Sequence, residues 1–231
     1  MLMIKKQVFM QKIDIKNAAT IILLRGSREN PQVLMGQRGK NASFMPNKFV
    51  FPGGALDPSD SEIDFEEKIS EKCLEKLKLK ADISIAQSLI AAGIRELWEE
   101  TGLILGTNWN KNISLIPENW KGFFASGYQP NAKNIDFVFR AITPPGRSRR
   151  FDARFFLVNS DNIVGDLDDF SNASGELSHL QWIKINSTKD LDLPFITEIV
   201  LKEVSSIIKG DVNDGIPFYY HDSGTSHFQR L

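Results

Sequence analysis

The segment of residues 95–103 limits what this chain can fold into more than any other part of the sequence. It reads Arg-Glu-Leu-Trp-Glu-Glu-Thr-Gly-Leu. It overlaps the end of residues 84–101, where apolar residues recur at the three- and four-residue spacing of an amphipathic helix. A glycine follows directly, in the position that commonly ends a helix. The sequence therefore predicts a helix that carries Glu96, Glu99 and Glu100 in its last turns.

The three glutamates share one face of this predicted helix. Each residue turns by about 100°, so Glu99 lies about 60° to one side of Glu96 and Glu100 about 40° to the other. Arg95 precedes Glu99 by four residues and can hold its carboxylate. Such a cluster is either a solvated surface or an oxygen-rich site for Mg²⁺ or Mn²⁺. The Gly-Gly turn after an apolar strand, at residues 53–54, favours the metal site.

The remaining hydrophobic pattern predicts an α/β sandwich with a mixed sheet. The alternation in residues 135–141 places Ile135, Phe137, Phe139 and Ala141 on one strand face and Asp136, Val138 and Arg140 on the other. Residues 211–231 are expected to form an extended, partly ordered tail. Strands are predicted at residues 18–24, 33–35, 49–51, 135–141, 151–158 and 180–185, and helices at 65–80, 84–101 and 194–209.

Composition excludes several classes of function. The net charge of -1 argues against bulk attraction to nucleic acid or to an anionic membrane. The longest apolar run, residues 18–24, is far shorter than the roughly 20 residues of a membrane-spanning helix. The start of the chain lacks the pattern of a signal peptide. The single cysteine, Cys73, is interpreted as a small apolar filler on a helix, and its being the only one favours a cytoplasmic setting.

The chain resembles the Nudix hydrolase family in these residues. The family signature reads Gly, five residues, Glu, seven residues, then Arg-Glu-apolar-x-Glu-Glu-x-Gly-apolar. Residues 95–103 match every fixed position of its second half, and the Phe-Pro-Gly-Gly of residues 51–54 matches its usual start. From Gly54 to Arg95 there are 41 positions (95 − 54) where the family has 14, so 27 residues are inserted. Gln87 stands where the first signature glutamate is expected.

The resemblance implies one Nudix domain over residues 1–231, an α-β-α sandwich with a mixed central sheet. Its core would cover about residues 16–209, with a helical insertion at about 58–84 and a tail at about 210–231. The insertion is expected either to cap one side of the cleft or to form a dimer surface.

The resemblance also implies roles for the residues of the cluster. Glu99 and Glu100 would be direct ligands of Mg²⁺ or Mn²⁺, and the carbonyl of Gly53 a further ligand. Glu96 would be a ligand or the base that helps to deprotonate water. Arg95 would orient the glutamates. A metal ion so placed neutralises diphosphate oxygens and lowers the pKa of a bound water.

Other candidates keep two interpretations each. Glu176, in the polar loop of residues 172–178, is either a catalytic or ligating acid or a solvated glutamate. Arg150 and Arg154 either grip substrate phosphates, or Arg154 pairs with Asp152 and holds the strand. Arg38 either faces the substrate cleft or is an ordinary surface arginine.

The insertion and residues 143–156 are similar to the bacterial relatives of the peroxisomal coenzyme A diphosphatases. This implies hydrolysis of the phosphoanhydride bond of coenzyme A or an acyl derivative. A close alternative is a pyrophosphatase for ADP-ribose, dinucleotides or related nucleotides. A third is a non-catalytic module that binds nucleotide, which the three retained glutamates argue against. In each case the partner is a small nucleotide.

Overall fold

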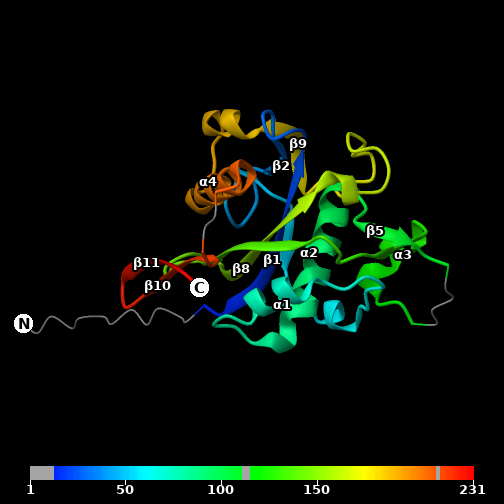
Figure 1. The fold of residues 1–231 in the computed structure, drawn as a ribbon, viewed down its shortest axis with the longest axis horizontal. Coiled ribbons are helices and arrows are strands. Elements are labelled where there is room, and N and C mark those ends of the chain that lie inside the picture. The colour runs from blue at the N-terminus through cyan, green and yellow to red at the C-terminus, as the bar shows by residue number, and fades with distance from the viewer. Residues whose placement is uncertain (1–12, 111–114, 212–213) are drawn as a thin grey trace, which may run out of the picture.

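A mixed β-sheet runs through the computed structural model, which describes residues 13–110, 115–211 and 214–231. The strands lie in the order β11-β10-β7-β8-β1-β2-β3, with β4 beside β1 and β9 beside β2 (Figure 1). β8 is parallel to β1, and β7 is antiparallel to β8, which confirms the predicted mixed sheet. The strands are β1 (Ile15–Arg25), β2 (Gln32–Arg38), β3 (Phe49–Val50), β4 (Gly53–Ala55), β7 (Asp136–Ile142), β8 (Arg150–Asn159), β9 (Leu177–Lys184), β10 (Pro217–Asp222) and β11 (Thr225–Arg230), and a separate pair joins β5 (Gly106–Asn108) to β6 (Tyr128–Pro130).

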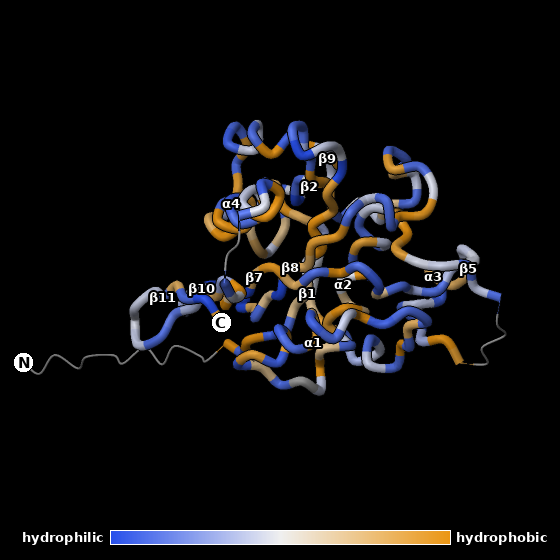
Figure 2. The backbone as a smooth tube through the Cα atoms, viewed as in Figure 1, coloured by the Kyte–Doolittle hydropathy of each residue, from blue (hydrophilic) through white to orange (hydrophobic). Residues whose placement is uncertain are grey.

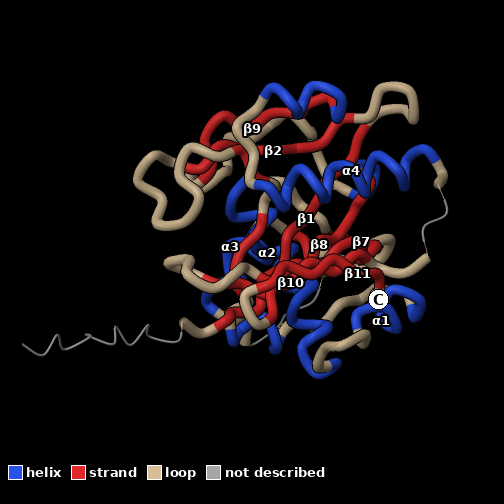
Figure 3. The backbone as a smooth tube through the Cα atoms, turned by 90° about the vertical axis from the view of Figure 1, so that its left-hand side faces the viewer, coloured by secondary structure: helices blue, strands red, loops and turns tan. Residues whose placement is uncertain are grey.

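Helices cover both faces of the sheet, so the fold is the predicted α/β sandwich. α1 (Glu71–Leu77), α2 (Ala86–Thr101) and α3 (Lys121–Ala125) lie on one face, and α4 (Phe195–Lys209) lies on the other (Figures 1 and 3). Ile21 of β1 packs on the α2 side and Ile22 on the α4 side. A strand buried on both faces has no polar side, which explains its continuous apolar sequence. Figure 2 shows the same hydrophobic interior.

α2 lies close against β1 and ends where its sequence predicts. Gly93 faces Ile21, and a Cβ at this glycine would lie 3.0 Å from the Ile21 Cδ1 atom. Gly102 adopts φ of 77°, and its N–H donates to the carbonyl of Trp98 at 2.7 Å. These two glycines let α2 approach the sheet and stop beside β4. Among the described residues, no helix combines the length and apolar character needed to cross a membrane.

The insertion is less helical than its sequence predicts. The helix expected over residues 65–80 covers only Glu71–Leu77, because the Ser70 hydroxyl caps its start by accepting the N–H of Cys73 at 3.2 Å. Short 3₁₀ turns, η1 (Pro58–Glu62) and η2 (Ile83–Ile85), form its two ends. Cys73 is buried as expected, and this burial raises the pKa of its thiol to about 11.

The prediction of an extended tail is wrong for most of residues 211–231. β10 and β11 form a hairpin, and β10 adds to the sheet beside β7 with Phe218 opposite Arg140. The turn between them has positive φ at Ser223 and Gly224, a geometry that suits a two-residue hairpin. The core therefore extends beyond residue 209.

The alternation predicted for β7 is also wrong in part. The register with β8 shifts between Phe137 and Phe139. Phe137 packs on the α2 side, whereas Val138 and Phe139 both pack on the α4 side. Such a bulge moves the following residues to the opposite face. As a result Arg140 lies opposite Arg154.

These two arginines form a buried ionic network around Asp152. Arg140 donates twice to the Asp152 carboxylate, at 2.9 and 2.7 Å, and Arg154 lies 3.1 Å from it. Arg154 also donates to Asn17 and is 2% exposed. Burial lowers the pKa of Arg154 to about 10. The structure thus favours pairing over substrate contact for Arg154, since its guanidinium is enclosed and occupied.

Arg140 also joins the insertion and the hairpin to the sheet. Its guanidinium donates to the carbonyls of Leu79 and Lys80, which follow α1. It also lies over the ring of Phe218 in β10, 4.6 Å from the centroid. One side chain therefore connects three segments that are far apart in the sequence.

Asp152→Ala is expected to lower the free energy of unfolding by about 3–5 kcal/mol, because it leaves two buried guanidinium groups without their carboxylate. Urea unfolding measures the change. Asp168→Ala is the matched control, since the Asp168 pair with Arg25 is at the surface and contributes about 1 kcal/mol or less. Equal losses in both variants would contradict the network's role.

Candidate functional site

The last turns of α2 place two glutamates against the Gly-Gly turn. Glu100 is buried and accepts the N–H of Gly53 at 2.8 Å. The Glu96 carboxylate lies against Gly54, where an added Cβ would be 2.3 Å from its carboxyl carbon. A side chain at residue 54 would therefore displace the Glu96 carboxylate, whereas glycine leaves that space free.

Arg95 holds the other side of the cluster. It donates to Glu96 at 2.8 Å and to Glu99 at 3.2 Å. It also donates to the carbonyl of Ala55 at 3.1 Å. Although burial alone would lower the Arg95 pKa, its bonds and the charges of its carboxylate partners raise it. Arg95 therefore contacts two of the three helix glutamates, Glu96 and Glu99.

Asp60 completes this arrangement, and sequence reasoning missed it. Its carboxylate accepts from the Arg95 Nε at 2.9 Å and from a terminal nitrogen of Arg95 at 3.1 Å. It also accepts the N–H of Asp57 and the indole N–H of Trp120. The signal was the Asp57-to-Asp60 spacing, which forms a capping box at the start of η1.

Glu176 lies beside the cluster, on the loop before β9. The N–H of Ser174 donates to the carbonyl of Glu99 at 2.8 Å, which fastens this loop to α2. Glu176 is exposed and pairs with Arg38 at 3.3 Å. Its charge contributes to raising the pKa of Glu96, Glu99 and Glu100. The structure thus brings Glu176 and Arg38 to the three helix glutamates.

The cluster has more negative than positive charge. Burial raises the pKa of Glu100 to about 8 and that of Glu96 to about 6, and it also raises the Glu99 pKa. Neighbouring carboxylates add to each increase. Against two arginines stand five carboxyl groups, namely Glu96, Glu99, Glu100, Glu176 and Asp60.

This donor set fits a hard divalent cation in kind and in charge. Carboxylate oxygens are the ligands that Mg²⁺ and Mn²⁺ prefer, and a dication would offset the excess negative charge. In the described residues no three acidic, histidine or cysteine side chains converge on one point. Instead Glu100 accepts a hydrogen bond from Gly53, while Glu96 and Glu99 accept hydrogen bonds from Arg95.

One of the predicted substrate residues, Arg150, lies away from the cluster. Arg150 donates to the carbonyl of Thr143 and is opposite Ile15 of β1. Thr20, the partner of Gly53, is five positions further along β1 (20 − 15), or about 16 Å at the rise of a strand. Gln87, at the place of the first signature glutamate, donates to the carbonyl of Ile63 in the insertion.

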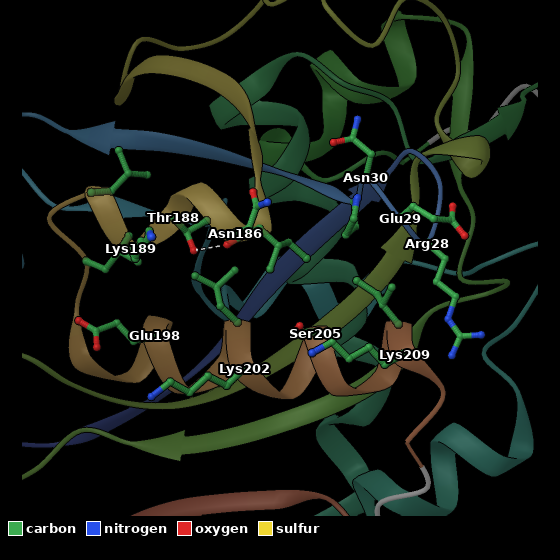
Figure 4. Close-up of a pocket in the computed structure, with 16 residues that line it drawn as sticks. Arg28, Glu29, Asn30, Asn186, Thr188, Lys189, Glu198, Lys202, Ser205 and Lys209 are labelled. Atoms are coloured by element: carbon green, nitrogen blue, oxygen red, sulfur yellow. Dashed lines mark hydrogen bonds between the residues drawn. The ribbon is translucent and has the colours of Figure 1, made fainter.

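A pocket of about 540 Å³ lies on the other side of the sheet, between α4 and the segment of residues 185–193 (Figure 4). Arg28, Lys189, Lys202 and Lys209 are among its lining residues. It contains none of the clustered glutamates, and it shares Leu193 and Leu201 with the core on the α4 side. The chemistry of the carboxylate cluster therefore belongs to a different face of the molecule.

Gly54→Ala is expected to displace the Glu96 carboxylate, because the new methyl group would occupy its position. The end of a glutamate side chain can move, so the cost in unfolding free energy should be at most about 1–3 kcal/mol. A crystal structure and a urea titration measure the two effects. Gly39→Ala serves as the control, since nothing lies within 4 Å of its Cβ position. If Glu96 kept its position in the Gly54→Ala variant, the close contact at residue 54 would not determine where the Glu96 carboxylate lies.

Comparison with known proteins points to one family, although no family profile matches the chain. A solved Nudix hydrolase from Alicyclobacillus acidocaldarius has a TM-score of 0.61 and 25% identity over 82% of this chain and 90% of that one. The Caenorhabditis elegans protein called nudix hydrolase 7 is 29% identical over 180 residues, 73% of this chain and 51% of its own length. The acyl-coenzyme A diphosphatase NUDT19 of Xenopus laevis is 31% identical over 110 residues, 38% of this chain and 27% of its own length.

The chain thus spans about half or less of the curated relatives it matches. Its sheet order, its signature helix and the solved relative nevertheless agree with one another. The chain has the Nudix fold, and its similarity in both sequence and structure is to Nudix hydrolases.

Proposed function

We propose that this protein is a divalent-metal-dependent hydrolase that cleaves the phosphoanhydride bond of a nucleoside diphosphate derivative. The observation that carries this proposal is the group of glutamates beside the Gly53-Gly54 turn, in which Glu100 is buried, Glu96 and Glu99 are partly buried, and the positive charge around them is too small to balance theirs. Burying carboxylates without a counter-charge is costly, so a protein that retains them has a use for them. The named Nudix hydrolases similar to this chain support the same reaction class.

Glu96, Glu99 and Glu100 would hold Mg²⁺ or Mn²⁺, with the carbonyl of Gly53 as a further ligand. The Gly53 N–H donates to Glu100, and in an extended strand the C=O of a residue points to the same edge as its N–H, which supports this role for the Gly53 carbonyl. When bound, the ion supplies charge neutralisation for the diphosphate and a more acidic water.

Other side chains would act on the substrate and the attacking water. Glu96 or Glu176 would accept the proton of the water, since both belong to the cluster and Glu176 is accessible from solvent. Arg38 would bind a phosphate oxygen. Its Nε is buried and has no partner among the described residues, and its bond to Glu176 is a long one. Arg150, about 16 Å along β1, would reach only a distant part of a long substrate.

Coenzyme A or an acyl derivative is the proposed substrate. The similarity to a protein named acyl-coenzyme A diphosphatase supports this choice. The products would be 3′,5′-ADP and a phosphopantetheine. A panel of coenzyme A, acetyl-coenzyme A, ADP-ribose and a dinucleotide, each with Mg²⁺ and Mn²⁺ and with product masses recorded, tests it.

Much faster cleavage of ADP-ribose than of coenzyme A would reject the substrate assignment but keep the reaction class. Binding of nucleotides without any cleavage would instead indicate a non-catalytic module.

Glu100→Gln is expected to lower turnover by about 10²-fold or more, because it removes a central charge of the metal site. Initial rates with saturating Mg²⁺ measure the effect. Glu198→Gln is the control, since Glu198 is exposed on α4, on the other face of the sheet. Unchanged Mg²⁺-dependent turnover in the Glu100 variant would remove this residue from the mechanism.

A further inference from the structure

Asp60 belongs to the insertion, yet it lies at the centre of the contacts that position the signature arginine. It is fully buried, at 0% exposure, and its two oxygens accept four hydrogen bonds. Two of these come from Arg95 in a fork-shaped pair, the strongest arrangement for a guanidinium and a carboxylate. An exposed insertion that only lengthened the chain would not need such a residue.

The fork decides how much of Arg95 is available to the metal-site glutamates. With its Nε and one terminal nitrogen directed to Asp60, the guanidinium offers a single nitrogen to Glu96 and Glu99. The bond to Glu99 is the longer of the two, at 3.2 Å. The negative charge of Asp60 also offsets part of the positive charge of Arg95, so Arg95 compensates less of the charge of Glu96 and Glu99.

We propose that Asp60 is a positioning residue of the active site, the counter-ion that keeps Arg95 from neutralising Glu96 and Glu99. On this view the insertion is part of the catalytic structure and supplies, through Asp60, the setting in which these glutamates bind a divalent cation. The inference rests on the proposed function for its link to turnover, but its first consequence is the affinity of the folded protein for Mn²⁺.

Trp120 and Asp57 hold Asp60 in turn. The Trp120 indole, which is fully buried beside α3, donates to one Asp60 oxygen at 3.1 Å, and the N–H of Asp57 donates to the other at 2.8 Å. Gln87 of α2 donates to Ile63 in the segment just after η1. The start of the insertion is therefore fixed to α2 and to the α3 region at the same time.

Asp60→Asn is the principal test, with Mn²⁺ binding measured by calorimetry on the full chain without substrate. The amide keeps the shape but removes the charge, so Arg95 is drawn towards Glu96 and Glu99. We expect Mn²⁺ to bind about 10-fold more weakly or worse, as is usual when a residue behind the metal ligands is changed. A crystal structure of the variant should show a shorter contact between Arg95 and Glu99 than 3.2 Å.

Glu75→Gln is the matched control, because it removes one negative charge from the same insertion at an exposed position on α1. Its Mn²⁺ affinity should equal that of the unaltered protein. If Asp60→Asn and Glu75→Gln both bind Mn²⁺ as the unaltered protein does, the proposal is overturned.

Trp120→Phe covers the case in which Asp60→Asn does not fold. It removes one of the four donors to Asp60 and keeps the charge pair with Arg95, so Mn²⁺ affinity should fall roughly two- to threefold. Unchanged affinity in a folded Trp120→Phe protein would then reject the proposal.

Turnover separates this proposal from the proposed function. If the unaltered protein cleaves its substrate, Asp60→Asn should lower kcat and leave KM nearly unchanged, because Asp60 does not touch substrate. A protein that binds Mn²⁺ in an Asp60-dependent way but cleaves nothing would refute the proposed function and retain the inference. A protein that cleaves its substrate but binds Mn²⁺ equally well with and without the Asp60 carboxylate would support the proposed function and refute the inference.

Discussion

The buried pairing of Arg95 with Asp60 is the interaction on which the site depends. Both side chains are almost wholly enclosed, so each needs the other as its counter-charge. Through this pair, α2, β4 and the insertion are fixed relative to one another, since Arg95 also donates to Ala55. The glutamates are then held on a rigid frame, the condition for placing charge accurately beside a reacting group.

The α2 face and the α4 face of the sheet differ in the side chains that they bury. On the α2 side, Gly54 lets the Glu96 carboxylate approach the backbone closely, and the aromatic residues Trp120 and Phe123 pack in the core of the same side. On the α4 side, aliphatic residues such as Val200 and Val204 close the core. The largest difference is charge, because the two acidic residues that are fully buried in the part of the chain that the structure describes, Asp60 and Glu100, both lie near β4 on the α2 side.

Much of this could be predicted from the sequence because its signals are local. The helix of residues 84–101, its glycine end and the strands of the central sheet follow from spacing and turn residues, and the structure agrees with them. The β7 bulge could not be predicted, because a register shift depends on the partner strand. The hairpin at residues 217–230 was missed although its Ser-Gly turn was a usable signal.

The same distinction applies to the site. Glu96, Glu99 and Arg95 are near neighbours on one helix, so their grouping follows from helical geometry. Asp60 lies 35 residues before Arg95, and no periodic pattern joins them. For Arg154 the sequence suggested too much. An arginine in a basic segment is a reasonable candidate for a phosphate ligand, but in the structure Arg154 pairs with Asp152 and donates to Asn17.

Arg140 couples the stability of the insertion to that of the β10–β11 hairpin. Its guanidinium donates to a carbonyl just after the inserted helix α1, pairs with the Asp152 carboxylate of β8 and lies over the Phe218 ring of β10. If the hairpin detached from β7, Arg140 would lose its contact with Phe218. Its hydrogen bonds to the carbonyls of Leu79 and Lys80 would then be less firmly held. The hairpin and the segment after α1 lie more than a hundred residues apart in the sequence, and their shared contact with Arg140 should make them open together as one cooperative unit.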